Sequence, residues 1–84
     1  MTSPPSPIEA QILVMTSERG PDKSICPSEV ARALDPDWRG MLTQVRQAAT
    51  RLAQAGRIEI LRKGKPVDPG AFKGVIRLRA KGPA

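Results

Sequence analysis

The middle of the chain carries hydrophobic residues at the spacing of an amphipathic helix. Five of these residues share one stripe at a period of about 3.6: Trp38, Leu42, Val45, Ala49 and Leu52. Gly56 follows at the position where a glycine commonly ends a helix. The pattern predicts a helix over about residues 36–55, with Asp35 as its N-cap and Pro36 at its first position.

Two shorter helices are predicted ahead of this one. The first begins at Pro7, because Ser6 and Glu9 complete a Ser-x-x-Glu capping box around it, and it ends at the Arg-Gly-Pro sequence of residues 19–21. The apolar side chains within residues 8–15 cover more than one face of this helix. We therefore expect the helix either to lie centrally in the domain or to offer a dimer surface.

The second helix begins at Pro27, with Cys26 or Ser24 as the preceding cap, and ends before Asp35. Four residues are expected to supply its inner side: Val30, Ala31, Ala33 and Leu34. Residues 23–25 form a short extended piece ahead of it, because the backbone before a proline is biased away from the helical region.

The period of the apolar residues changes to two after the long helix. Ile58 and Ile60 alternate with polar residues in a first strand of about five residues, and Ile76 and Leu78 do so in a second. The stretch 62–70 between them contains two prolines and two glycines, which predict an irregular and basic loop. The two strands therefore read as an antiparallel hairpin with a basic tip.

The predicted order of elements is helix, short strand, helix, turn, helix and hairpin. Three helices can pack their apolar stripes together while the hairpin covers the open side. The second and third helices form a helix-turn-helix, and the hairpin that follows takes the place of a wing. The sequence predicts an α+β fold, a winged helix over residues 6–80, with a disordered tail at 1–5 and a C-terminal tail at 81–84.

Charge is distributed unevenly along the 84 residues. The chain has 14 Lys and Arg, 8 Asp and Glu and no histidine, for a formal net charge of +6. Residues 38–84 hold eleven of the basic residues and two of the acidic ones, and no acidic residue occurs from Trp38 to Ile58. Such a positive pole is expected of a surface that binds phosphate backbones, although an unevenly charged solvated surface is the simpler alternative.

Cysteine usage and hydropathy point to the cytoplasm. The single cysteine, Cys26, excludes an internal disulfide and fits a reducing compartment. The longest apolar run, residues 12–15, is too short to span a bilayer, and the N-terminus lacks the basic start and apolar core of a secretory signal. We therefore expect a cytoplasmic protein with no membrane contact.

Six segments of the chain carry a family likeness. They are Lys23–Leu34, Trp38-Arg39, Val45-Arg46, Arg51-Leu52, Lys63–Pro69 and Gly74–Arg79. Together they resemble a bacterial domain-of-unknown-function family (numbered 3253), over roughly residues 7–79 of the chain. The resemblance implies a winged-helix fold, and it implies no activity because the family's role is itself unassigned.

The outer face of the long helix and the basic hairpin tip supply the candidate nucleic-acid-binding residues. A helix can enter the major groove when its solvent face carries hydrogen-bond donors and no carboxylates. Side chains in its first half suit base edges, and the arginines and lysines suit phosphates, unless they merely form a solvated basic face. Ten residues make up the predicted site: Arg39, Thr43, Gln44, Arg46, Gln47, Thr50, Arg51, Arg62, Lys63 and Lys65.

Three residues outside this set can each be interpreted in a structural or a functional way. Trp38 heads the apolar stripe, so it is expected to anchor the core in preference to stacking on a base. Cys26 stands at a helix start, where a thiolate is stabilised, but without a histidine partner it is read as a cap or small core residue. Gly40 either lets the backbone approach DNA closely or weakens the helix locally.

These observations predict nucleic-acid binding, with double-stranded DNA favoured over RNA, by a small regulator or a nucleoid accessory protein. The alternative is a protein–protein interaction module that uses the winged helix as a scaffold and pairs through its first helix, for example as a homodimer. An enzyme is not expected, because the chain lacks histidine, carboxylate pairs outside capping positions and an activated nucleophile. Neither a cofactor, a metal nor a small-molecule substrate is expected.

Overall fold

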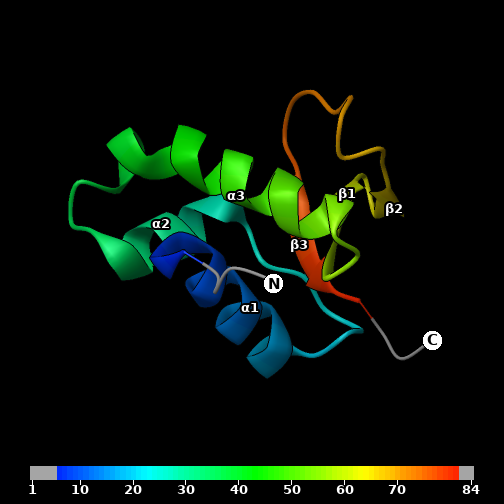
Figure 1. The fold of residues 1–84 in the computed structure, drawn as a ribbon, viewed down its shortest axis with the longest axis horizontal. Helices are drawn as coiled ribbons and strands as arrows, with labels where there is room; N and C mark the ends of the chain where they lie inside the picture. Colours follow the sequence, from blue (N-terminus) through cyan, green and yellow to red (C-terminus); the bar gives the residue numbers. More distant parts are fainter. Residues whose placement is uncertain (1–5, 82–84) are drawn as a thin grey trace, which may run out of the picture.

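The computed structural model describes residues 6–81, and the predicted tails at 1–5 and 82–84 lie outside the described residues. Its elements follow in this order: α1 (Pro7–Arg19), α2 (Pro27–Leu34), the 3-10 helix η1 (Trp38–Met41), α3 (Leu42–Gln54), β1 (Ile58–Arg62), β2 (Lys65–Pro66) and β3 (Arg77–Ala80). Figure 1 shows α3 lying across α1 and α2, with the sheet at one end of the helices. The predicted α+β class is confirmed.

The first helix begins and ends where the sequence predicts. The Ser6 hydroxyl accepts a hydrogen bond from the Glu9 N–H, and the Glu9 carboxylate accepts one from the Ser6 N–H, each at 3.2 Å. Ile12 is fully buried, and α1 packs against α2, α3 and β3. Its packing against three elements agrees with the expected central position, and a dimer surface on this helix stays a prediction. Its outer side leaves Val14 50% exposed.

The second helix also matches its predicted bounds. The prediction that four of its residues face the core is wrong for one of them. The Glu29 carboxylate accepts a hydrogen bond of 2.6 Å from the Cys26 N–H, so Cys26 is the residue that precedes the helix. Val30 and Ala31 are buried, whereas Ala33 is exposed. Ala33 lies roughly 110° around the helix from the centre of the buried stripe, too far to reach the core from a helix of two turns.

The third helix starts later than predicted. Residues Trp38–Met41 form a 3-10 turn, and the α-helix begins at Leu42. Asp35 does not cap it, because helical backbone begins only at Trp38, and the Asp35 carboxylate accepts a hydrogen bond of 2.9 Å from the Asp37 N–H inside the turn that precedes it. The residues from Asp35 to Asp37 therefore form a turn that separates the two helices.

From Leu42 onward the predicted apolar stripe is confirmed. Val45, Ala49 and Leu52 are buried, together with Ala48, and the helix ends ahead of Gly56. The Gly56 N–H bonds the Ala53 carbonyl at 3.0 Å, and the next N–H along the chain bonds the Leu52 carbonyl at 2.9 Å. This pair of bonds is a Schellman motif, which satisfies the last carbonyls of the helix.

The predicted antiparallel hairpin is confirmed. Ile58 of β1 lies opposite Ala80 of β3, and Leu61 lies opposite Arg77. The extended piece ahead of α2 joins the same sheet, because Ile25 pairs with Leu78 in an isolated antiparallel bridge. The order of elements predicted for a winged helix is therefore present.

The loop between β1 and β3 is more regular than predicted. Its first residues turn back on β1, so that Lys65 of β2 lies opposite Arg62. Lys63 and Gly64 have φ angles of 53° and 80°, positive at both positions as the two-residue type I′ turn requires. Sequence periodicity missed β2 because it is only two residues long and includes Pro66. We call residues 63–76 the wing loop.

The core lies between the three helices and the inner face of the sheet. Apart from Thr16, its fully buried members are aliphatic and come from every layer, with Ile12 from α1, Val30 from α2, Val45 from α3 and Ile60 from β1 among them. This packing fixes how α3 and the wing loop are presented to solvent, since both are anchored to it by one apolar side.

Candidate nucleic-acid interface

The outer face of α3 is polar and free of carboxylates. Its exposed side chains are Thr43, Gln44, Gln47, Arg51 and Gln54. At 3.6 residues per turn these positions fall on one side of the helix, opposite the buried stripe. Three of the predicted base-reading residues, Thr43, Gln44 and Gln47, therefore point to solvent together, as the sequence predicts.

Thr50 lies at the edge of this face and is half-buried. Its hydroxyl donates a hydrogen bond of 3.0 Å to the Arg46 carbonyl one turn earlier in α3. A hydroxyl that bonds its own helix backbone has no donor left for a ligand, although its oxygen can still accept. Thr50 is therefore the least accessible of the predicted polar contacts on α3.

Arg51 is exposed and forms an ion pair with α1. Its Nη2 lies 3.6 Å from Oε1 of Glu9, the carboxylate that also caps α1. The pKa of Glu9 is lowered, chiefly by the backbone hydrogen bond from Ser6 and to a smaller extent by the Arg51 guanidinium. An exposed pair of this kind contributes little stability, so the guanidinium keeps donors that can turn to a phosphate.

Arg46 is half-buried and contacts the wing loop. Its Nη2 donates a hydrogen bond of 3.2 Å to the Gly74 carbonyl, and its guanidinium carbon lies 5.2 Å from the centre of the Phe72 ring. The sequence predicts a free phosphate ligand at this position, whereas the structure places the side chain against its own chain. The sequence gives no sign of this contact, because Gly74 is 28 residues away from Arg46.

Arg39 lies in η1, beside Trp38. The guanidinium carbons of Arg39 and Arg32 each lie 4.5 Å from the centre of the Trp38 ring. Trp38 is half-buried and packs against the core. The ring is therefore enclosed by core residues and cations, in agreement with the expectation that it anchors the domain.

The turn between β1 and β2 presents three cations in four residues. Arg62, Lys63 and Lys65 are all exposed. The wing loop holds one more exposed cation, Lys73, which lies outside the basic stretch 62–70 that the sequence predicts. The signal that could have found Lys73 is the start of the second strand at Arg77, because everything before it belongs to the loop.

One protein family matches the sequence over all the helices and strands described above. The model of the family described as "Protein of unknown function (DUF3253)" matches residues 5–81, from ahead of α1 to the end of β3. The chain belongs to this family. No curated protein matches the chain. The match confirms the family to which the sequence motifs point.

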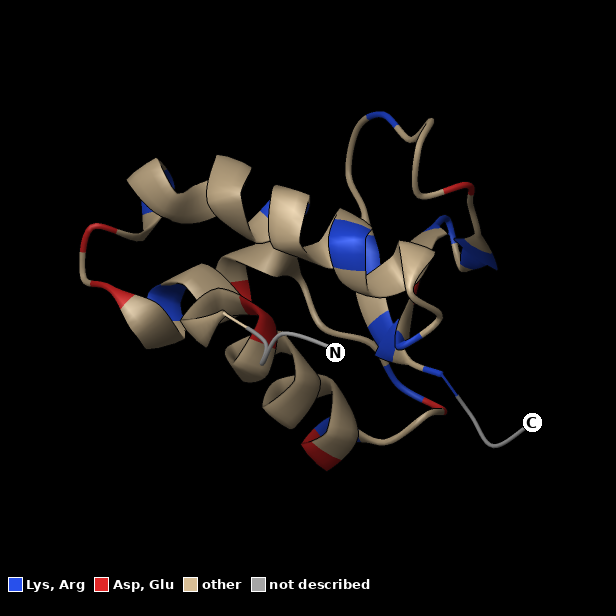
Figure 2. Ribbon diagram, viewed as in Figure 1, with Lys and Arg blue, Asp and Glu red and all other residues tan. Residues whose placement is uncertain are grey.

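The α3 helix of this DUF3253 protein carries basic and neutral residues only. Figure 2 shows acidic residues on α1, on α2 and on the turn between α2 and α3, and also on the segment between α1 and α2 and in the wing loop. Two further cations are engaged on the sheet. The guanidinium of Arg77 donates to the Ser24 hydroxyl at 2.6 Å, and that of Arg79 pairs with Glu59 at 2.9 Å. The available cations of the DUF3253 chain are therefore fewer than its composition suggests.

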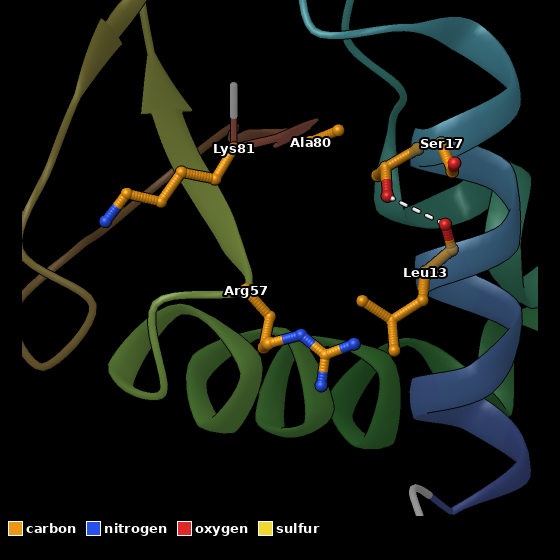
Figure 3. Close-up of a pocket in the computed structure, with 6 residues that line it drawn as sticks. Leu13, Ser17, Arg57, Ala80 and Lys81 are labelled. Carbon is orange, nitrogen blue, oxygen red and sulfur yellow. Dashed lines mark hydrogen bonds between the residues drawn. The ribbon is translucent and has the colours of Figure 1, made fainter. Parts of the chain in front are cut away.

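A shallow cavity of about 270 Å³ opens between α1 and the start of β1 (Figure 3). Arg57 and Lys81 contribute its cationic lining, and Leu13 and Ser17 contribute its α1 side. The Lys81 ammonium lies near Gly56, just past the end of α3, where the carbonyl end of a helix carries partial negative charge.

The other residues weighed in the sequence have local explanations in the DUF3253 fold. Cys26 is a half-buried free thiol whose sulfur accepts a hydrogen bond of 3.1 Å from the Ser28 hydroxyl. Gly40 is exposed in η1. Within residues 6–81, no three His, Cys, Asp or Glu side chains are arranged to hold a metal ion. Every helix in that range is too short or too polar to cross a bilayer.

Proposed function

We propose that this DUF3253 protein binds double-stranded DNA, with α3 in the major groove and the wing loop against the neighbouring phosphate backbone. The proposal rests on one observation above all. The solvent face of α3 presents hydrogen-bonding side chains and one arginine, no carboxylate occurs on it, and an exposed cationic turn of residues 62–65 follows in the same domain. Its function is binding without catalysis, in the cytoplasm, by a small regulator or a nucleoid accessory protein.

The dimensions of a helix support the choice of ligand. An α-helix with its side chains is about 10–12 Å across, and the major groove of B-form DNA is about 12 Å wide. The amides of Gln44 and Gln47 can each form two hydrogen bonds with an adenine edge. The major groove of an A-form RNA duplex is too deep and narrow for side chains to read, which favours DNA over RNA.

Phosphate contacts are assigned to the exposed cations around this face: Arg39, Arg51, Arg62, Lys63, Lys65 and Lys73. Each neutralised phosphate lowers the slope of log K against log salt by about 0.9, so six contacts give a slope of roughly −5. Binding of this kind is weak and depends little on sequence at physiological salt, with dissociation constants of about 10⁻⁴ to 10⁻⁶ M.

A protein–protein function through α1 has less support. The apolar side chains of α1 pack into the core, and Val14 is the one large apolar residue of this helix that stands about half exposed within residues 6–81. Single exposed apolar residues are common on monomers and form no patch. A homodimer through α1 stays a prediction, which sedimentation of the wild type and of Val14→Lys can test.

The deciding experiment is fluorescence anisotropy with a random duplex of about 20 base pairs, titrated at 50 and 150 mM salt. The expected result is binding at 50 mM salt that weakens on the order of 10²-fold at 150 mM, as a slope near −5 requires. Lys63→Glu should weaken it further, and a double-stranded RNA of the same length should compete poorly. Failure to bind the DNA at 50 mM salt, or a flat salt dependence, would overturn the proposal.

A further inference from the structure

One side chain connects α3 to the wing loop. Arg46 donates to the Gly74 carbonyl at 3.2 Å, and its guanidinium carbon lies 5.2 Å from the centre of the Phe72 ring. The arginine is half-buried between the helix and the loop, and Phe72 packs against the core from the loop side. The contact therefore has a directional part, the hydrogen bond, and a packed part, the stacking on the ring.

The rest of the wing loop is held differently. Its first half is tied to the sheet and to itself, because the Val67 N–H bonds the Ile60 carbonyl at 2.9 Å and the Ala71 N–H bonds the Asp68 carbonyl at 3.0 Å. In the described part of the chain, no backbone–backbone hydrogen bond holds residues 72–75. Val75 at the end of that segment is 83% exposed. The Arg62 guanidinium also lies against Gly74, so the position of residues 72–75 depends on Phe72 packing, on Arg46 and on Arg62.

We propose that Arg46 is a positioning residue that holds residues 72–75 beside α3, so that Lys73 meets the DNA backbone at a set distance from the recognition face. This inference rests on the proposed function for its consequence, and on the contacts of Arg46 for its cause. The guanidinium is already engaged by Gly74 and Phe72, so it acts on DNA through the loop instead of through a phosphate of its own.

Lysine at position 46 separates the two roles. A lysine keeps the positive charge and can contact a phosphate as a point charge, but it lacks the planar fork that reaches a carbonyl while stacking on a ring. A phosphate ligand therefore tolerates Arg46→Lys, and a positioning residue does not. Arg46→Met removes both the charge and the fork, and it serves as the reference for complete loss.

The first test measures loop motion in the free protein. Backbone ¹⁵N order parameters of residues 73–75 are recorded for the wild type, Arg46→Lys, Arg46→Met and the matched control Arg51→Lys, whose side chain contacts Glu9 of α1. The expected values are near 0.85 in the wild type and control, and below about 0.6 in both Arg46 variants, with α3 unchanged. Order parameters in Arg46→Lys that equal those of the wild type would overturn the proposal.

The second test is a double-mutant cycle of DNA binding between Arg46→Lys and Lys73→Ala. Lys73→Ala should weaken binding severalfold in the wild-type background and by less than about twofold in the Arg46→Lys background, because the loop no longer presents Lys73. If Arg46 contacts a phosphate itself, Arg46→Lys binds within about twofold of the wild type, Arg46→Met reduces the salt slope by about 0.9, and the effects add. That result would also overturn the proposal.

The two tests fail separately. A wild-type protein that binds no DNA removes the proposed function, and the order parameters then decide alone whether Arg46 holds the loop. A wild-type protein that binds DNA while residues 73–75 stay rigid in Arg46→Lys removes the positioning role and leaves the proposed function standing.

Discussion

Ile25 and Leu78 exchange two backbone hydrogen bonds of 2.8 Å each, which attach the segment between α1 and α2 to β3. Both side chains are buried, at 1% and 0% exposed. The bridge closes the sheet over the helices and links the first half of the chain, which holds α1, to the hairpin that carries the wing loop. It acts together with the hydrogen bonds from Arg77 to Ser24, which attach the same segment to β3.

Substitution of Ile25 should therefore destabilise the whole domain. We expect Ile25→Ala to lower the free energy of unfolding by about 2–5 kcal/mol, because it leaves a cavity beside Leu78 in a fully buried position. Urea denaturation followed by circular dichroism measures this change. Val75→Ala, at an exposed position, should stay within about 0.5 kcal/mol of the wild type. Equal effects of the two substitutions would contradict the assignment of Ile25 to the core.

The two capping glutamates predict how stability depends on pH. The pKa of Glu9 is lowered chiefly by the backbone hydrogen bond from Ser6, and that of Glu29 chiefly by the backbone hydrogen bond from Cys26. A carboxyl whose pKa is lower in the folded state stabilises the protein above its unfolded pKa, and the stabilisation is lost as the pH falls through the folded pKa. Stability should therefore decline as the pH falls below 4.5, the ordinary pKa of a glutamate side chain.

Chemical denaturation at pH 7, 4.5 and 3 measures this decline. The variant Glu9→Gln with Glu29→Gln keeps the shape of both side chains and removes their titration, so it should be less stable than the wild type at pH 7 and flatter between pH 4.5 and 3. A wild type whose free energy of unfolding stays constant over this range would contradict the role of these two carboxylates.

A carboxylate placed on the outer face of α3 should weaken DNA binding strongly. Gln47→Glu changes one exposed amide into an anion with little change of shape, so it would face phosphates and base acceptors with like charge. We expect binding to weaken by about tenfold or more at 50 mM salt, since like-charge contacts at an interface cost up to several kcal/mol. Gln11→Glu on α1 alters the net charge equally and should change affinity by less than about twofold. Equal losses would indicate that net charge alone governs binding.

Trp38 should matter for stability and not for DNA contact. Trp38→Leu removes the ring that Arg32 and Arg39 cover and part of the packing against the core, so we expect a loss of about 1–3 kcal/mol in the free energy of unfolding. DNA affinity should stay within about twofold of the wild type. Stacking of the ring on a base would instead cost about 1–3 kcal/mol of binding free energy, which anisotropy resolves easily.

Lys63 should lower the stability of the fold while it strengthens DNA binding. Its φ of 53° is unfavourable for lysine and suits asparagine, the preferred first residue of a type I′ turn before glycine. We expect Lys63→Asn to raise the free energy of unfolding by about 0.5–1 kcal/mol and to reduce the salt slope of DNA binding by about 0.9. A slope equal to that of the wild type would show that Lys63 does not contact a phosphate.

Local patterns in the sequence were sufficient for the apolar stripes and for the helix ends other than the start of α3. The capping box of Ser6 and Glu9, the stripe through Val45 and Leu52, and the alternation around Ile58 are all set by residues within a few positions of one another. The start of α3 was predicted wrongly because Asp35 and Pro36 are compatible with either a helix cap or a turn. The structure has the turn, because helical backbone begins only at Trp38 and the Asp35 carboxylate bonds the Asp37 N–H ahead of it.

By itself, the sequence determined the α+β class, the order of the elements and the carboxylate-free side of α3, because period and capping act over one or two turns of chain. Only the tertiary structure decided which cations remain available. Arg46 donates a hydrogen bond to the Gly74 carbonyl, Arg77 donates one to Ser24, and Arg79 donates one to Glu59. The partners in these bonds are 20 to 53 residues apart in the sequence. Such partners are brought together by the closing of the sheet over the helices, and no local pattern of residues specifies them.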